Sequence, residues 1–93
     1  MGRSPREKPD RLPEKLAHIR AALGLSQNEM LVRLGLGGKR IRTAVSNYEL
    51  GNSEPPLPII LRYARLAGIC TDVLLDDELD LPAKLPAKPK HRP

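Results

Sequence analysis

The sequence of 93 residues has few aromatic side chains and a single cysteine. It contains two tyrosines, no phenylalanine and no tryptophan, so any core must be built mainly from aliphatic residues. The single cysteine, Cys70, excludes an intramolecular disulfide and cannot form a zinc site by itself, and we expect it to be buried. No apolar run approaches the roughly 18 residues that a membrane helix needs. These absences predict one small soluble domain located in the cytoplasm.

Groups for catalysis or metal binding are also sparse. The two histidines, His18 and His91, have no second metal ligand three or four residues further along the chain. The acidic run at residues 76–80 lacks the alternating ligands and the glycine of a calcium loop, and we expect it to be solvated. The chain also has no glycine-rich phosphate loop. We therefore expect no enzyme activity, no metal and no cofactor.

The ten prolines lie in three short regions, at residues 5–13, 55–58 and 82–93. Because proline breaks helix interiors, packed helices are expected between these regions. Helical spacing of apolar residues predicts five short helices there, at residues 12–23, 26–34, 41–50, 58–67 and 72–75.

Local signals mark several boundaries. Ser26 and Glu29 have the spacing of a capping box, and Gly51 is expected to stop a helix in the left-handed conformation. Residues 1–11 are interpreted as a flexible basic arm and residues 77–93 as a flexible tail rich in proline and lysine. Residues 12–76 then form the folded domain.

A domain of this size has a small core, so individual leucines should matter to its stability. We predict that Leu31→Ala and Leu61→Ala each cost about 2–5 kcal/mol. The net charge of +5 favours an anionic partner such as nucleic acid, although a solvated surface explains a charge of this size equally well.

Several segments in this order resemble a known family. They are Gly-Leu-Ser-Gln-Asn-Glu-Met at residues 24–30, Leu-Gly at 34–35, Val-Ser-Asn-Tyr-Glu-Leu-Gly at 45–51, Pro56, and the apolar helices at 59–68 and 72–75. Together they look like the Cro/phage-repressor (XRE-like) helix-turn-helix family. The resemblance implies an all-α, compact, five-helix lambda-repressor-like domain that binds double-stranded DNA as a homodimer. It also implies a transcriptional regulator, specifically a repressor, whose 41–50 helix enters the major groove.

The resemblance and the direction of the core face together suggest the residues that contact DNA. Base-reading positions are expected at Arg42, Thr43, Ala44, Ser46 and Asn47, with Arg42 suited to guanine and Asn47 to adenine. Phosphate contacts are expected from Gln27, Asn28, Lys39, Arg40, Asn52 and Ser53. Structural roles are expected for Tyr48, packed under its helix, and for Glu49, paired inside the domain with a partner such as Arg20.

Two departures from the family pattern leave alternatives open. The turn before the reading helix is about four residues longer than the family's, and Lys39 and Arg40 within it either reach the DNA backbone or belong to a tolerated insertion. After Gly51 the chain lacks the basic residue that the family often has there, and Glu54 would repel a nearby phosphate.

A protein-binding role is the main alternative function. An antitoxin, for example, would use the same fold, and its tail at residues 81–93 would fold on a partner protein. For a homodimer, the expected contact is apolar surface around Ile69, Val73 and Leu74. Binding to a membrane surface is excluded because the tail contains too many prolines for an amphipathic helix.

Overall fold

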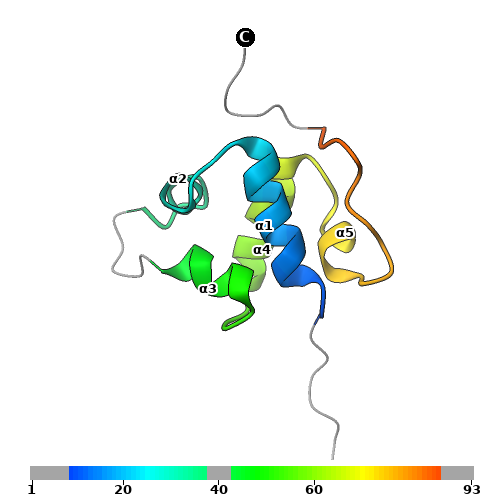
Figure 1. Ribbon diagram of the computed structural model, residues 1–93, viewed down its shortest axis with the longest axis horizontal. Coiled ribbons are helices and arrows are strands. Elements are labelled where there is room, and N and C mark those ends of the chain that lie inside the picture. The colour runs from blue at the N-terminus through cyan, green and yellow to red at the C-terminus, as the bar shows by residue number, and fades with distance from the viewer. Residues whose placement is uncertain (1–8, 38–42, 87–93) are drawn as a thin grey trace, which may run out of the picture.

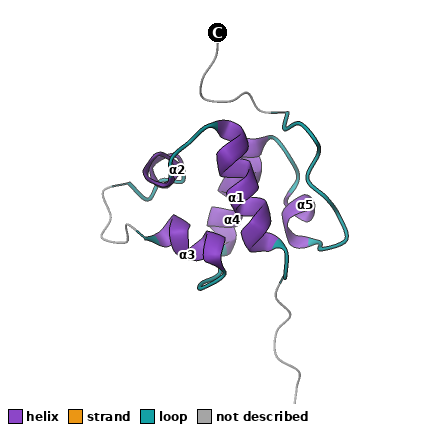
Figure 2. Ribbon diagram, in the orientation of Figure 1, coloured by secondary structure: helices purple, strands orange, loops and turns teal. Residues whose placement is uncertain are grey.

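The computed structural model describes residues 9–37 and 43–86, and within them the chain forms five α-helices and no strand. Figures 1 and 2 show short helices arranged around the central pair α1 and α4. In chain order the helices are α1 (Leu12–Leu23), α2 (Gln27–Arg33), α3 (Ala44–Leu50), α4 (Leu57–Ala67) and α5 (Thr71–Leu75). The predicted all-α, five-helix fold is confirmed. In the part of the chain described, no helix has both the length and the apolar character needed to cross a bilayer.

The boundaries of α1 and α2 follow from local chemistry. Pro13 lies in the first turn of α1, where its missing N–H is not needed, and Gly24 ends the helix. At the start of α2, Ser26 Oγ accepts a hydrogen bond from the Glu29 backbone N–H at 3.0 Å. The Glu29 carboxylate in turn accepts from the Ser26 backbone N–H at 2.8 Å. The predicted capping box is therefore confirmed.

The starts of α2, α4 and α5 each differ from the sequence prediction by one residue. The predicted helix at 41–50 has its first two residues outside the described part of the chain, and Thr43 precedes the first residue of α3 rather than lying within the helix. Helix α5 starts at Thr71, with Cys70 before it and no side-chain cap. Cys70 is exposed, so the prediction that it is buried was wrong. The residue that precedes a short surface helix lies at the rim of the core, where a small apolar side chain is not covered.

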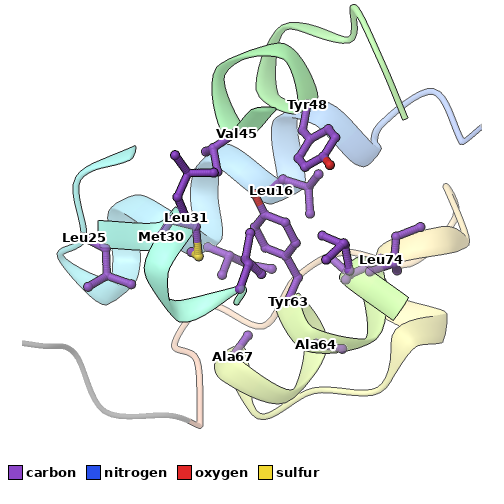
Figure 3. Packing of buried hydrophobic residues seen from close by; sticks show 14 of the residues in the cluster. Leu16, Leu25, Met30, Leu31, Val45, Tyr48, Tyr63, Ala64, Ala67 and Leu74 are labelled. Carbon is purple, nitrogen blue, oxygen red and sulfur yellow. The ribbon is translucent and has the colours of Figure 1, made fainter. Parts of the chain in front are cut away.

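The core lies between α1 and the four other helices (Figure 3). Its buried side chains are aliphatic apart from the two tyrosines, and include Leu12, Leu16, Ile19, Leu23, Leu25, Met30, Leu31, Leu34, Val45, Ile59, Ile60 and Leu74. Leu31 is 6% exposed, as its predicted role requires. Leu61 is 39% exposed, so its predicted place in the core was wrong. The inner face of α4 is formed instead by residues such as Ile60, Tyr63 and Ala64, and Leu61 lies on the other side of the helix.

Tyr63 is the largest side chain with no exposed surface. Figure 3 shows its ring extending from α4 into the middle of the cluster. Burial raises the pKa of the Tyr63 hydroxyl far above its ordinary value, and the Glu49 carboxylate adds to the shift. Tyr63 is therefore a neutral core residue.

A buried lysine joins α1 to the end of α5. Lys15 is only 2% exposed, and its ammonium group donates hydrogen bonds to the carbonyl oxygens of Val73 at 2.7 Å, Asp76 at 2.9 Å and Leu79 at 2.7 Å. An ammonium has three N–H groups, so these carbonyls match its capacity. The last carbonyls of a helix have no partner within the helix, and Lys15 supplies one for α5.

The segment after α5 also completes the start of α1. No side chain close in sequence caps this helix. Instead, the two carboxylate oxygens of Asp77 accept hydrogen bonds from the backbone N–H groups of Asp10, at 2.9 Å, and Arg11, at 3.0 Å. These two bonds lower the pKa of Asp77, and the bond from the Arg11 N–H has the larger effect. The Arg11 guanidinium donates to the Asp77 carbonyl oxygen and pairs with Asp80, each at 2.8 Å.

We call the contacts of Lys15, Arg11 and Asp77 the terminal clasp. The clasp changes the interpretation of residues 77–93 as a tail detached from the domain. Asp77, Leu79 and Asp80 take part in the clasp, and Leu81 and Leu85 pack against the core. The acidic run at residues 76–80, expected to be only solvated, includes a helix cap. The predicted boundary at residue 76 therefore lies within a set of tertiary contacts.

Candidate nucleic-acid interface

Helices α2 and α3 form the two-helix unit that the sequence predicted. They contact each other, and α3 also packs against α1 (Figure 1). The inner face of α3 is made by Ala44, Val45 and Tyr48. Tyr48 is 9% exposed, which confirms that it packs under its helix, and burial raises the pKa of its hydroxyl. The opposite side of α3 remains available to a partner.

The predicted base-reading residues fall into three groups. Thr43 is exposed just before α3, and Ser46 and Asn47 are partly exposed on its first turns. Arg42 lies outside the described residues. Ala44 is 5% exposed and belongs to the core, so its methyl group is not free to contact a base. Ala44 is one helical turn before Tyr48, so the two side chains share the inner face of α3.

The predicted phosphate-binding residues lie at both ends of this unit. Gln27 and Asn28 are exposed in the first turn of α2, and Asn52 and Ser53 are exposed just after α3. Lys39 and Arg40 lie outside the described residues. The structure therefore places four of the six predicted side chains at the surface of α2 and the loop after α3.

A charged pair ties α1 to α3 and to the loop before α2. The Arg20 guanidinium donates to both carboxylate oxygens of Glu49, at 2.6 and 3.1 Å, and to the Leu25 carbonyl at 2.9 Å. The Glu49 side chain is only 8% exposed, and the pair raises the pKa of Arg20. Glu49 is therefore paired inside the domain with Arg20, as predicted.

The same carboxylate fixes the first turn of α2. Gln27 Nε2 donates to Glu49 Oε1 at 3.2 Å, so the amide is held beside α3 while its second N–H remains for another acceptor. An amide held in this way is suited to a phosphate oxygen. Neutralisation of Glu49 by Arg20 reduces the repulsion that a bare carboxylate would exert on that phosphate.

A second polar group runs along the outer side of α3. Asn47 Nδ2 donates to Thr43 Oγ1 at 3.4 Å, and Asn52 Nδ2 donates to Asn47 Oδ1 at 3.4 Å. These side chains come from the residue before the helix, from its middle and from the loop after it. The structure therefore brings three of the predicted DNA-contacting residues together in one row.

Sequence reasoning missed Arg62, which holds the end of α2. Its guanidinium donates to the Leu34 carbonyl at 2.6 Å and lies against Gly35, where a Cβ would come within 2.9 Å of Nη1. Gly35 has a φ of 81°, which also favours glycine. In the sequence, Arg62 is an ordinary arginine on the exposed side of α4. Nothing near it predicts a hydrogen bond to a carbonyl 28 residues earlier.

Comparison with known proteins supports the helix-turn-helix assignment. No protein-family model matches the chain. A 62-residue segment is 34% identical to the SPbeta prophage-derived uncharacterized HTH-type transcriptional regulator YonR of Bacillus subtilis (strain 168). The match covers 67% of this chain and 54% of that protein, so the chain spans about half the length of this relative.

Two solved structures share the fold. The P22 c2 repressor, crystallised with synthetic operator 9T in the presence of Tl+, superposes with a TM-score of 0.61 at 21% identity, covering 71% of this chain and 94% of the repressor. At that identity the likeness shows the fold alone. The hypothetical transcription factor NHTF from Neisseria has a TM-score of 0.59 at 29% identity, covering 87% of this chain and 90% of that protein. Together with the capping box of α2 and the internal Arg20–Glu49 pair, these similarities agree with the resemblance of the chain to the Cro/phage-repressor (XRE-like) helix-turn-helix family.

Proposed function

We propose that this protein is a sequence-specific DNA-binding transcriptional regulator, and specifically a repressor, that reads the major groove with α3. The observation that carries the proposal is the polar outer side of α3, which no other described helix covers. The Arg20–Glu49 pair holds α3 against α1, and the bond from Gln27 to Glu49 holds it next to α2. YonR is described as an HTH-type transcriptional regulator, and the P22 c2 repressor was crystallised with an operator, which supports the same role here. We propose that it acts in the cytoplasm.

Base reading is assigned to the side chains that the structure leaves on the outer side of α3. Asn47 suits adenine, because its amide offers one donor and one acceptor to the N7 and N6 positions. Thr43 and Ser46 flank it with hydroxyl groups. For Arg42 we keep the prediction from the sequence that it contacts guanine. Ala44 is not assigned a base contact, because it is buried.

Phosphate contacts are assigned to the two ends of the unit. Gln27 and Asn28 would contact one stretch of backbone, and Asn52 and Ser53 another, so that α3 is oriented between them. The proposed contacts of Lys39 and Arg40 rest on the sequence. Their charges would make binding depend on salt, because cations released from DNA accompany each neutralised phosphate.

A homodimer is proposed because one reading helix covers only half of a two-fold operator. The surface expected for its contact needs a correction. Leu74 has no exposed area and belongs to the core, whereas Ile69 and Val73 remain partly exposed. The similar proteins do not favour the alternative of an antitoxin or protein-binding module, and the first part of its expected binding tail packs on the domain itself.

The test is selection of bound sequences from a randomised duplex pool, followed by fluorescence-anisotropy titration of the selected duplex at several salt concentrations. We expect a short palindrome bound by two chains. Asn47→Ala should lose preference at one base pair per half-site and retain weak, salt-sensitive binding. Binding without sequence preference by the wild-type chain would refute the proposal.

A further inference from the structure

Helices α1 to α4 end in the same local motif. Each is followed by a glycine with positive φ, and the next backbone N–H donates to the carbonyl five residues earlier. This is the Schellman motif, which supplies partners for the last carbonyls of a helix. The four bonds from an N–H to the carbonyl five residues earlier are Leu25 to Arg20 at 3.1 Å, Leu36 to Leu31 at 2.8 Å, Asn52 to Asn47 at 2.9 Å and Ile69 to Ala64 at 3.0 Å.

The residue after the glycine distinguishes α3 from the other three helices. A Schellman motif is usually accompanied by a hydrophobic contact of this residue, and Leu25, Leu36 and Ile69 all pack in or against the core. After α3 the corresponding residue is Asn52, which is exposed. Its partner across the motif is Asn47, another asparagine. At this helix end, the usual apolar contact is replaced by a polar pair.

The backbone determines where the Asn52 side chain lies. The Asn52 N–H bonds the Asn47 carbonyl at 2.9 Å, and the Gly51 N–H bonds the Tyr48 carbonyl at 3.3 Å. Gly51 has a φ of 80°, a conformation that residues with a Cβ rarely adopt. Because these bonds are formed within the free protein, Asn52 is placed beside Asn47 before any partner arrives.

The two side-chain bonds of Asn47 hold its amide on the outer side of α3. The carboxamide oxygen accepts from Asn52, and the carboxamide nitrogen donates to Thr43. In the observed orientation, Oδ1 keeps one free lone pair and Nδ2 keeps one free N–H.

We propose that Asn52 is a positioning residue that determines base specificity by holding the Asn47 side chain in the conformation that presents its amide to a base. The proposal rests on the proposed DNA-binding function and assigns Asn52 a role beyond a phosphate contact. The free lone pair and the free N–H of Asn47 match the N6 amino group and the N7 atom of adenine, in one order only. Without the bond from Asn52, the Asn47 side chain would divide its population among several rotamers, and only one of them presents the amide to the base.

The experiment compares the full chain with Asn52→Ala and Asn52→Asp on two duplexes. One is the selected operator, and the other has the base pair read by Asn47 replaced. We expect Asn52→Ala to reduce the discrimination between them by about threefold to tenfold, part of what one bidentate base contact provides. His18→Ala, an exposed change on α1, is the control and should retain the wild-type ratio.

Asn52→Asp gives the sharper test. A carboxylate can only accept, so it would attract Nδ2 of Asn47 and reverse the amide, while the Thr43 hydroxyl can donate to the reversed oxygen. The discrimination should fall further than in Asn52→Ala. The added negative charge weakens binding to both duplexes alike and leaves the ratio of the two affinities unchanged. A change in that ratio therefore reports the reversal of the Asn47 amide.

A double-mutant cycle separates positioning from an independent phosphate contact. If Asn52 acts through Asn47, the change Asn52→Ala should not alter the base preference further once Asn47→Ala is present. Equal loss of affinity for both duplexes in Asn52→Ala, with an unchanged ratio, would overturn the inference but leave the DNA-binding function standing. A wild-type chain without sequence preference would overturn both. Unchanged thermal melting of each variant shows that folding is not the cause.

Discussion

The terminal clasp and the α2–α3 surface use polar side chains in opposite ways. In the clasp, the bonds made by Lys15 and by the Asp77 carboxylate span 2.7–3.0 Å, and Lys15 is almost fully buried. On the outer side of α2 and α3, the amides of Gln27, Asn47 and Asn52 make bonds of 3.2–3.4 Å and lie at the surface.

The difference separates two uses of polarity in one small domain. The short bonds of the buried Lys15 have a full set of partners and stabilise the fold, because breaking them leaves polar groups without water. Long bonds at the surface orient side chains at little cost and leave donors and acceptors for a ligand. Changes in the clasp should therefore affect stability, and changes in the row of amides should affect recognition.

The largest loss of stability is expected where α2 is attached to the core. Leu31 is 6% exposed, and Leu31→Ala should reduce the free energy of unfolding by about 2–5 kcal/mol because it leaves a cavity. Leu61 is 39% exposed, and Leu61→Ala should cost less than about 1 kcal/mol. Urea denaturation of both variants measures the contrast. Equal losses would show that the assignment of the two faces of α4 is wrong.

The second largest loss of stability is expected in the terminal clasp. Lys15→Met keeps most of the side-chain volume but leaves the carbonyls of Val73, Asp76 and Leu79 without their donor. We expect a loss of about 3 kcal/mol in the free energy of unfolding, with base preference unchanged at temperatures where the variant is folded. Lys84→Met, at an exposed position, is the matched control. A Lys15→Met protein as stable as the control would mean that the three bonds contribute nothing net.

Asp77 should make stability depend on pH. Its pKa is lowered in the folded state by the N–H groups of Arg11 and Asp10, so the ionised form stabilises the fold above the ordinary aspartate pKa. That contribution is lost as the pH falls through the lowered pKa. Asp77→Ala should therefore melt at a lower temperature than wild type at pH 7, and the two curves should converge in acid. Glu78→Ala, an exposed neighbour, should show no such convergence; a constant gap at every pH would contradict the capping role.

The smallest effect is expected at Gln27 and concerns affinity alone. Gln27→Ala removes one neutral hydrogen bond to the DNA backbone, so binding should weaken by about fivefold, or about 1 kcal/mol, for every duplex. Thermal stability should change little, because the bond to Glu49 is long and exposed. Anisotropy titrations against the selected and an unrelated duplex test this. A change in base preference would place Gln27 among the base readers instead.

The features that the sequence predicted depend on residues close together in the chain. Helix periodicity, the capping box of Ser26 and Glu29, and the stop at Gly51 are all local patterns, and all three are present. The predictions that Tyr48 is buried and that Glu49 pairs inside the domain came from the family resemblance. A family resemblance carries information on tertiary contacts that residue spacing lacks.

The features that were missed depend on distant parts of the chain. Lys15 has the composition of a surface residue, and nothing near it indicates three carbonyls about 60 residues away. Asp77 lay in an acidic run that resembled ordinary solvated sequence, although it caps a helix 66 residues earlier. Ala44, Cys70 and Leu61 were misplaced because short helices allow a rotation of the buried face that periodicity does not determine.

The terminal clasp also has a consequence for synthesis on the ribosome. Helix α1 is made first, but both the cap at its start and the partners of Lys15 belong to residues 73–79. A nascent chain that has exposed only α1 to α4 therefore carries an uncapped first helix and a lysine with no carbonyls to bind. Contacts of such long sequence separation close last and slow folding. The domain can reach its final stability only after the segment following α5 has left the exit tunnel.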